Sequence, residues 1–226
     1  EDIRCGVDVA TGDLNGDGKD EIITVPGSGC PAQVRIFDFR GDPIFIPGFY
    51  AYSPNLRTGF RVAAGDLNGD GKDEIVIVPQ ERARAYVRIF DYLGQPKFIP
   101  GFYAYEDLTP GADVATGDLN NDNKDEIITV PGTGSPAHVR FFNYLGNLVI
   151  NPGFYAYDKN IKTGFHVASG DFNCDGKSEI ITIPRSGAAS QVRLFDAEGE
   201  PMFTPGFYTY YNWLNAGGDV AVGGIL

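Results

Sequence analysis

Residues 12–22 read GDLNGDGKDEI, and residues 65–75 repeat the same letters. Two close variants follow, GDLNNDNKDEI at 117–127 and GDFNCDGKSEI at 170–180. The four copies begin at Asp13, Asp66, Asp118 and Asp171, so they are 52 or 53 residues apart. Such a fixed spacing indicates a chain built from internal repeats, and the repeat decides the fold class.

Each repeat also carries four short apolar segments. In the first repeat they are the run before the loop (7–12), EIITVP (21–26), VRIFD (34–38) and PGFYAY (47–52). These segments are rich in Val, Ile, Phe and Tyr and are bounded by Gly, Pro, Asn and Asp, which predicts β-strands. No segment has helical periodicity over ten or more residues.

The runs of the EIITV type show no polar alternation, so both of their faces should be buried between neighbouring sheets. Four-stranded units of about 53 residues, stacked face to face, predict an all-β β-propeller of four blades. We expect one repeat domain over 1–226. The stretch 217–226 matches the strand before each loop but has no loop after it. It either begins a fifth unit of a larger ring or closes a ring of four, and we favour closure.

Oxygen-bearing side chains occupy positions one, three, five and nine of each loop, a spacing that suits calcium. Carboxylates about 5 Å apart at an effective dielectric near 20 repel by roughly 3 kcal/mol a pair, so a cation would stabilise the loop. Gly or Asn at position six permits a left-handed backbone, and position seven offers its carbonyl. The candidate ligands in loops 13–21, 66–74, 118–126 and 171–179 are Asp13, Asn15, Asp17, Lys19 and Glu21; Asp66, Asn68, Asp70, Lys72 and Glu74; Asp118, Asn120, Asp122, Lys124 and Glu126; and Asp171, Asn173, Asp175, Lys177 and Glu179.

Two alternatives to this ion loop fit the sequence less well. An EF-hand needs flanking helices and a bidentate Glu at position twelve, where the first loop has Thr24. A plain Asn/Asp/Gly turn needs no ion, but four copies that each keep a carboxylate at position nine argue against it. We therefore expect about four Ca²⁺ ions per chain.

The net charge of −12 is largely explained by these loops, because twelve carboxylates lie at positions one, five and nine. This acidity argues against nucleic acid as a partner. No run of about 18 apolar residues is present, so no membrane span is expected. The chain opens at Glu1 without a signal peptide, which indicates a processed product or an excised piece.

The three cysteines point to one disulfide. Cys5 and Cys30 lie in the same repeat and are both replaced in the other repeats, which suggests that they are bonded; three unpaired cysteines are the alternative. Cys174, inside an ion loop, is expected to be a free thiol. A disulfide together with low-affinity calcium loops indicates an extracellular or cell-surface location.

The stretch TGFRVAAGDLNGDGKDEIVIVP (58–79) resembles an FG-GAP repeat, the blade unit of integrin α-subunit propellers. It is also similar to the VCBS-type repeats of bacterial surface proteins. The resemblance covers all four units. It implies that the loop joins the first two strands of a blade and binds calcium through Asp13, Asn15, Asp17, Glu21 and their equivalents. The departures are Asn123 in place of Gly, Glu at position nine where Asp is commoner, and a weak GAP signature.

Two further repeated features are candidate sites. One arginine recurs in the third strand of each repeat; it could form a ligand ring, but pairing with a carboxylate is favoured. Tyrosine pairs could line sugar sites, with blade-to-blade packing as the alternative, favoured for the neighbouring Phe residues. Trp213 is expected in an exposed link. The positions are Arg35, Arg88, Arg140 and Arg193, and Tyr50/Tyr52, Tyr103/Tyr105, Tyr155/Tyr157 and Tyr208/Tyr210.

The segments between the second and third strands vary most: GSGCPAQ, QERARAY, GTGSPAH and RSGAASQ. A protein or glycan ligand is therefore expected on their side, opposite the ion loops. The chain has two histidines and no motif of a known catalytic site, so we expect no enzyme activity. The preferred function is an extracellular calcium-binding propeller for adhesion or partner binding. The alternatives are a calcium-dependent lectin and an accessory domain of a larger secreted enzyme.

Overall fold

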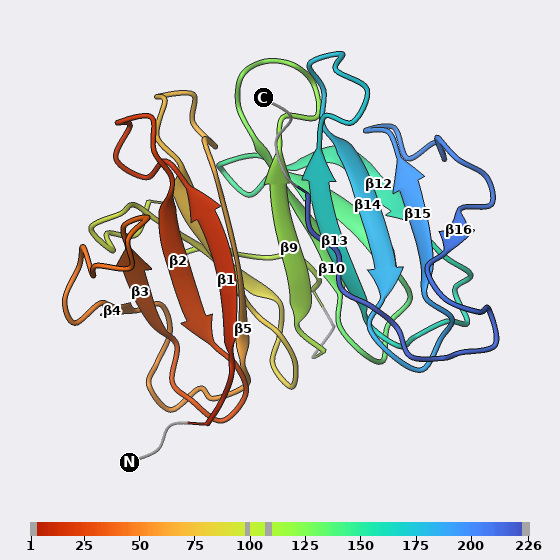
Figure 1. Cartoon of the computed structure of the whole chain (residues 1–226), viewed down its shortest axis with the longest axis horizontal. Helices are drawn as coiled ribbons and strands as arrows, with labels where there is room; N and C mark the ends of the chain where they lie inside the picture. The colour runs from red at the N-terminus through yellow and green to blue at the C-terminus, as the bar shows by residue number, and fades with distance from the viewer. Residues whose placement is uncertain (1–3, 98–99, 107–109, 223–226) are drawn as a thin grey trace. The chain divides into compact units, whose positions relative to one another are not determined.

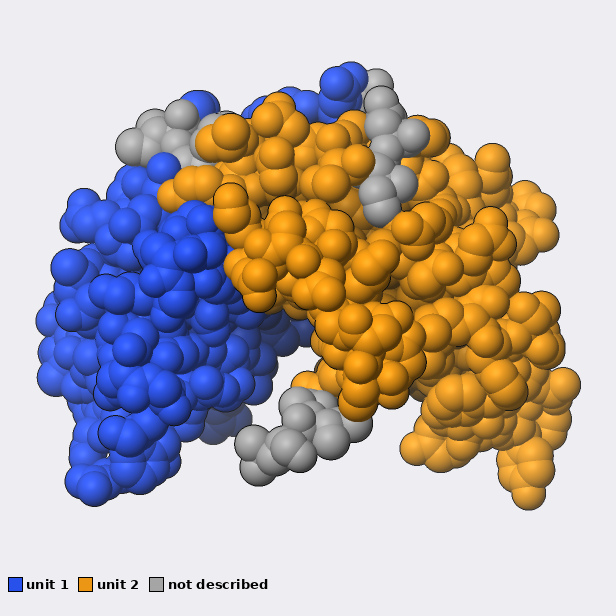
Figure 2. All heavy atoms as spheres, turned by 90° about the horizontal axis from the view of Figure 1, so that it is seen from above, with its two compact units in different colours: residues 1–112 blue, residues 113–226 orange. Residues whose placement is uncertain are grey.

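The protein is described by a computed structural model that covers residues 4–97, 100–106 and 110–222. Within these ranges all regular structure is β-strand, arranged as four antiparallel sheets of four strands each. The chain divides into two compact units, Glu1–Ala112 and Asp113–Leu226 (Figure 2). Each unit holds two sheets. The predicted four blades of four strands are confirmed.

In the first unit, each sheet is built from strands in chain order (Figure 1). Blade 1 consists of β1 (Val7–Gly12), β2 (Glu21–Pro26), β3 (Gln33–Phe37) and β4 (Phe49–Tyr50). Blade 2 consists of β5 (Phe60–Gly65), β6 (Glu74–Pro79), β7 (Tyr86–Phe90) and β8 (Phe102–Tyr103).

The second unit repeats this plan. Blade 3 consists of β9 (Ala112–Gly117), β10 (Glu126–Pro131), β11 (His138–Phe142) and the longer β12 (Leu148–Tyr155). Blade 4 consists of β13 (Phe165–Gly170), β14 (Glu179–Pro184), β15 (Gln191–Phe195) and β16 (Phe207–Tyr208).

The first hairpin of a blade has a fixed register. Gly12, the last residue of β1, pairs with Glu21, the first residue of β2, and Gly65 pairs with Glu74 in the same way. Gly170 and Glu179 repeat the pairing in blade 4. The residues between each pair therefore form the loop whose ligands the sequence suggested, and the glutamate stands at its neck. The prediction that the loop joins the first two strands is confirmed.

The second strand is buried on both faces in three blades and on one face in blade 1. Every residue of β6 and β10 is buried, and β14 has one half-buried position. In β2 buried and half-buried residues alternate, with Ile22, Thr24 and Pro26 less covered. The prediction of two buried faces is wrong for β2, because within the first unit a sheet packs against one side of blade 1.

The cores lie between the paired blades. In the first unit, side chains of blades 1 and 2 form one cluster that includes Ile23, Val34, Tyr52 and Phe60. In the second unit, Val139, Phe141 and Phe165 belong to the corresponding cluster. Since both clusters draw on two sheets, each blade depends on its neighbour for burial.

The stretch 217–226 was predicted to be a strand. Residues 215–222 have no strand assignment, and 223–226 lie outside the described residues. The Gly218 N–H donates to the Pro184 carbonyl at 2.9 Å. A methyl group on Gly170 would lie 2.5 Å from Val222 Cγ1, just as one on Gly12 would lie 2.8 Å from Ala64 in the next blade. This C-terminal tail (218–222) thus lies against β13 where the first strand of a following blade would lie.

The described part of the chain contains no helix with the length and apolar character needed to cross a bilayer.

Candidate metal centre

The aspartate at position one winds each loop around its own carboxylate. Asp13 Oδ1 accepts the N–H groups of Gly16 (2.8 Å) and Asp17 (3.0 Å), and its Oδ2 accepts that of Gly18 (2.8 Å). Burial raises the pKa of Asp13, but these N–H groups together outweigh it and lower the pKa below its ordinary value. Asp66 and Asp118 accept the equivalent N–H groups in their loops.

Two positions in every loop have a left-handed backbone. The sequence predicts this backbone at position six, and the structure confirms it. The φ values there are +82° at Gly18, +79° at Gly71, +61° at Asn123 and +86° at Gly176. Position four was missed, although its Gly, Gly and Asn in the first three loops were a usable signal. The φ values there are +78° at Gly16, +80° at Gly69, +61° at Asn121 and +62° at Cys174.

The glutamate at position nine is buried and closes the neck of the loop. Glu74 is 3% exposed; its Oε2 accepts the Leu67 N–H at 3.1 Å and its Oε1 accepts the Asn68 side-chain N–H at 2.5 Å. The other loops repeat both bonds, from Leu14 and Asn15 to Glu21, from Leu119 and Asn120 to Glu126, and from Phe172 and Asn173 to Glu179.

Burial also changes the acidity of these glutamates. It raises the pKa of Glu74 to about 7, with a further contribution from the charge on Asp70. Burial likewise raises the pKa of Glu126 to about 7, helped by Asp122, and raises the pKa values of Glu21 and Glu179. A carboxylate held among other carboxylates in this way is stabilised by a positive charge.

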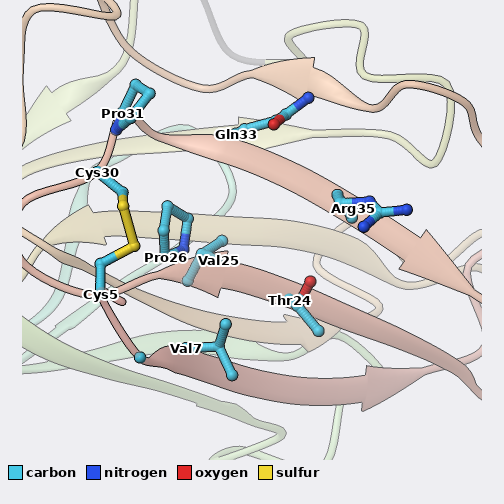
Figure 3. A pocket seen from close by; sticks show the side chains of 10 residues that line it. Cys5, Val7, Thr24, Val25, Pro26, Cys30, Pro31, Gln33 and Arg35 are labelled. Atoms are coloured by element: carbon cyan, nitrogen blue, oxygen red, sulfur yellow. A yellow bond between two sulfur atoms is a disulfide. The ribbon is translucent and has the colours of Figure 1, made fainter. Parts of the chain in front are cut away.

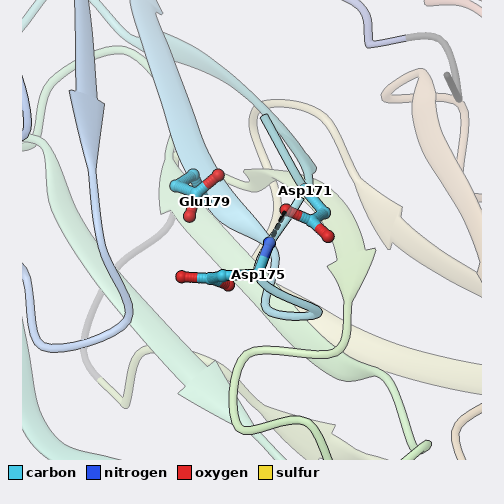
Figure 4. Close-up of side chains that lie close together, drawn as sticks. All are labelled: Asp171, Asp175 and Glu179. Atoms are coloured by element: carbon cyan, nitrogen blue, oxygen red, sulfur yellow. Dashed lines mark hydrogen bonds between the residues drawn. The ribbon is translucent and has the colours of Figure 1, made fainter. Parts of the chain in front are cut away.

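The fourth loop brings three carboxylates together. One oxygen each from Asp171, Asp175 and Glu179 lies within 4.8 Å of the others (Figure 4). Oxygen-only donors of this kind fit a hard divalent cation. Asp171, Asn173, Asp175 and Glu179 would hold such an ion. The Asn173 side chain lies beside these carboxylates, since its N–H groups donate to Asp175 Oδ2 (3.0 Å) and Glu179 Oε1 (2.9 Å); its amide oxygen would be the group that binds the ion.

In the other three loops the predicted residues form the same turn, but their carboxylate oxygens do not come as close to one another. Among the described residues, the fourth loop alone has three carboxylate or imidazole ligands within that distance. The lysine at position seven contributes its N–H to the aspartate at position five in every loop, at 2.9–3.0 Å. A ligand role for its carbonyl stays a prediction.

Neighbouring loops are linked within each unit. The Asp73 N–H donates to the Asp13 carbonyl at 3.0 Å, and Asp73 Oδ2 accepts the Asp13 N–H at 2.9 Å. Burial raises the pKa of Asp73 to about 6, with Asp20 and Asp66 adding to it. In the second unit the Ser178 N–H donates to the Asp118 carbonyl at 2.7 Å. Position eight, which lies between two candidate ligand positions, thus joins two blades, a role that the sequence pattern did not indicate.

The repeated arginines bind carbonyl groups. Arg88 donates to the Ala51 carbonyl, and Arg193 donates to the Ala156 carbonyl at 2.5 Å. The predicted carboxylate pairing is therefore wrong for both. The preceding blade presents a backbone carbonyl at this point, and a carbonyl oxygen accepts a guanidinium N–H as a carboxylate would.

In the first three repeats the tyrosine pairs divide into an exposed and a buried member, whereas Tyr208 and Tyr210 of the fourth are both exposed. Tyr52 and Tyr157 are 9% and 6% exposed and pack between blades, so the packing alternative is confirmed for them. The Phe49–Phe90 and Phe154–Phe195 ring pairs, at 4.9 and 4.6 Å, confirm it for phenylalanine. The first tyrosines, at positions 50, 103, 155 and 208, are exposed. Trp213 is exposed as expected and stacks on Tyr211.

The cysteine predictions are confirmed. Cys5 and Cys30 form a disulfide with Cα atoms 6.0 Å apart (Figure 3). Cys174 is free and exposed. The bond ties the segment before β1 to the loop between β2 and β3.

The chain is similar to known proteins in sequence and in structure. Mouse integrin alpha-8 is 27% identical over 65% of this chain, which spans 15% of that protein. A Bacillus licheniformis rhamnogalacturonan lyase has a TM-score of 0.59 at 16% identity, over 90% of this chain and 43% of its own. Rhamnogalacturonan lyase YesW has a TM-score of 0.56 at 15% identity, over 88% of this chain and 42% of its own. At these identities the lyases share the fold alone.

The family assignment comes from the repeats themselves. A family model described as an FG-GAP-like repeat matches residues 13–77 and 66–129, together more than half of the chain. Both matches begin at the first aspartate of a loop, and blades 1, 2 and 4 share the strand register on which that loop depends. The chain therefore belongs to the FG-GAP-like repeat family, and its blades are of the β-propeller type.

Proposed function

We propose that this chain is a non-catalytic, calcium-stabilised β-propeller module that binds a protein partner at the cell surface or outside the cell. The observation that carries the proposal is the loop that recurs in all four blades with a buried glutamate at its neck, and whose fourth copy brings Asp171, Asp175 and Glu179 within 4.8 Å of one another. Membership of the FG-GAP-like family and the similarity to mouse integrin alpha-8 support a role in partner binding or adhesion.

Calcium is the proposed ion, with one ion in each loop and four per chain. All candidate donors are oxygen atoms, and the loops are short and rich in carboxylate, which favours Ca²⁺ over transition metals. The disulfide between Cys5 and Cys30 supports an oxidising compartment, where calcium is also abundant.

The ion proposal is tested by melting the full chain in excess Ca²⁺, in excess Mg²⁺ and with a chelator, together with metal analysis after dialysis. Binding to the native state alone stabilises it by about 2.7 kcal/mol per site at a hundred times the Kd, so the melting temperature should rise with Ca²⁺. The double variant Asp171→Asn/Asp175→Asn should lose one bound ion and keep the others. A melting temperature that changes with neither calcium nor chelator would contradict the proposal.

The partner is proposed to bind the loops between the second and third strands. In the first unit the Gly29 N–H donates to the Arg57 carbonyl at 2.9 Å, and Ser28 Oγ donates to the Thr58 carbonyl at 2.9 Å. The variable loop thus packs on the link to the next blade, at the strand ends away from the ion loop. An adhesion assay on cells should lose signal when the loop 80–86 is replaced by the loop 132–138, and keep it when Lys72→Ala is introduced.

A lectin is the second candidate, because exposed tyrosines recur at one position in the blades, 40–49% exposed. A glycan array containing rhamnogalacturonan fragments tests it, and it also tests an accessory role beside a secreted enzyme. The same polysaccharide tests the absence of catalysis, because we expect that incubation with this chain alone releases no cleavage product from it. Saturable binding of a sugar that fails for Tyr103→Ala would favour the lectin over the protein-binding proposal.

A further inference from the structure

Blade 1 has a pocket on its less covered face. It has a volume of about 420 Å³ and is lined mainly by apolar groups beside the disulfide (Figure 3). Four of its lining residues are Val7, Thr24, Gln33 and Arg35, which come from three neighbouring strands. The pocket is therefore a built feature of the sheet.

The same four positions in blades 2 and 4 hold a tyrosine of the preceding blade. In blade 2 the Tyr52 hydroxyl lies 2.7 Å from the Ile77 carbonyl and 2.5 Å from the Tyr86 carbonyl, and its ring stacks on Phe60 at 5.3 Å. Arg88 completes the site by donating to the Ala51 carbonyl. We call this set of four positions the tyrosine socket of a blade.

Blade 4 repeats the arrangement in the second unit. The Tyr157 hydroxyl lies 2.7 Å from the Thr182 carbonyl and 2.6 Å from the Gln191 carbonyl, and its ring stacks on Phe165 at 5.1 Å. The strand registers match across the three blades, since Thr24, Ile77 and Thr182 each pair with the socket arginine of the next strand. Blade 1 therefore presents the same backbone carbonyls to its pocket.

Exposure separates the socket of blade 1 from the two filled sockets. Phe60 and Phe165 are fully buried, whereas Val7 at the same position is 72% exposed. Val62 and Val167 are 6% and 5% exposed, whereas the equivalent Val9 is 59% exposed. A set of apolar side chains that is buried in blades 2 and 4 is thus exposed to solvent in blade 1.

The chain also carries a tyrosine of the matching kind. Tyr210 follows Thr209, whose N–H donates to the Ser190 carbonyl at 3.0 Å, and Ala51 and Ala156 donate to Ala32 and Ala137 in the same way. The backbone of Tyr210 is therefore placed as the backbones of Tyr52 and Tyr157 are. Yet Tyr210 is 62% exposed.

We propose that the pocket of blade 1 is a tyrosine socket and that its occupant is Tyr210 of a second copy of this chain. The two copies then associate head to tail, with the hydroxyl of Tyr210 donating to the carbonyls of Thr24 and Gln33. Arg35 donates to the carbonyl of Thr209, as Arg88 does to that of Ala51. Such a heterologous contact uses two different surfaces of one chain.

The C-terminal tail (218–222) competes with this contact. It lies against β13, at the place that β1 of the second copy would take. The tail has no strand assignment, whereas β1 is paired with β2 along all six of its residues. A blade strand held by its own sheet therefore displaces the tail, and a chain shortened to end at Gly217 should associate more tightly than the full chain.

Sedimentation velocity over a range of concentrations tests the proposal on the full chain. We expect a species heavier than the monomer. Tyr210→Ala should raise the Kd by more than about tenfold, and Tyr210→Phe should raise it by about tenfold through loss of the hydroxyl. Tyr208→Ala is the matched control, since Tyr208 is exposed two residues away outside the socket position, and it should leave the Kd unchanged.

Complementary variants make the test specific. Thr24→Trp fills the socket and Arg35→Glu repels the incoming carbonyl, and either should abolish self-association while the circular dichroism stays native. Tyr210→Ala keeps the socket and Thr24→Trp keeps the tyrosine, so mixing these two variants should restore one contact and give a species of twice the monomer mass. A chain that is monomeric at every concentration would overturn the proposal, and so would oligomers unaffected by Tyr210→Ala.

Discussion

The glutamate at position nine matters before any ion is considered. Glu74 accepts two N–H donors, one on each carboxylate oxygen, in a buried neck. In Glu74→Gln one oxygen becomes an NH₂ group that faces a donor, so a buried N–H loses its acceptor. We expect a loss of about 1–3 kcal/mol in the free energy of unfolding, measured by urea denaturation without calcium.

Asp20→Asn is the matched control for this change. It also removes a loop carboxylate, but at the exposed position eight of the first loop. Its stability should stay within about 0.5 kcal/mol of the wild type. If both variants lost the same stability, general charge repulsion would explain the result and the neck hydrogen bonds would not.

The glycine of the PGFY motif is required by the backbone itself. Gly48 has φ +94°, and a methyl group there would lie 2.1 Å from the Val34 carbonyl oxygen. Gly48→Ala should therefore cost about 3 kcal/mol or more in denaturant unfolding, from backbone strain and the clash together. Gly41→Ala has a similar φ of +86° but meets nothing within 4 Å, so it should cost only about 1 kcal/mol. If the two variants lost the same stability, the Val34 carbonyl would have moved to accommodate the added methyl group.

At the scale of the strand pair, the buried tyrosine hydroxyl joins two blades. Tyr157→Phe leaves the Thr182 and Gln191 carbonyls without this donor and keeps the ring in place. We expect a loss of about 1–2 kcal/mol, read from the urea midpoint. Tyr155→Phe, on the exposed tyrosine of the same motif, should change little; an equal effect of the two variants would count against the inter-blade role.

The elements themselves followed from the sequence because their signals are local. Short Val/Ile runs between Gly and Pro gave the strands, and the loop spacing gave the hairpin that holds Asp13 and Glu21. The two tyrosines of one PGFYAY motif could not be told apart, because a two-residue shift keeps the same side of a strand. Which of them is buried depends on where the next sheet lies, and no local pattern records that.

At the scale of the whole molecule, the disulfide constrains the first repeat. It joins Cys5 and Cys30 across 25 residues. In the chain-entropy model a loop of this size stabilises by about 3 kcal/mol. The double variant Cys5→Ser/Cys30→Ser should lose about that amount in guanidinium unfolding. Cys174→Ser changes a free, exposed thiol and should leave stability nearly unchanged. A double variant as stable as the wild type would show that the neighbouring sheet already holds this segment.

Contacts between blades were the least predictable part of the molecule. The arginine of the third strand was expected to face a carboxylate, yet Arg88 faces the Ala51 carbonyl of the preceding blade. The uncovered side of β2 was also missed, because all four repeats have nearly the same sequence there. Segments of nearly the same sequence differ in burial only through the blades that lie beside them, so the segment itself cannot predict its burial.

The matched register of tyrosine and socket has an evolutionary consequence. Blades 1 and 3 each supply the tyrosine that the following blade accepts, so duplication of one complete repeat inserts a new tyrosine and a new socket together. Deletion of a complete repeat removes both at once. A lineage can therefore lengthen or shorten this gene by whole repeats without changing the contact between neighbouring blades. A break inside a repeat would leave one tyrosine without a socket or one socket without a tyrosine.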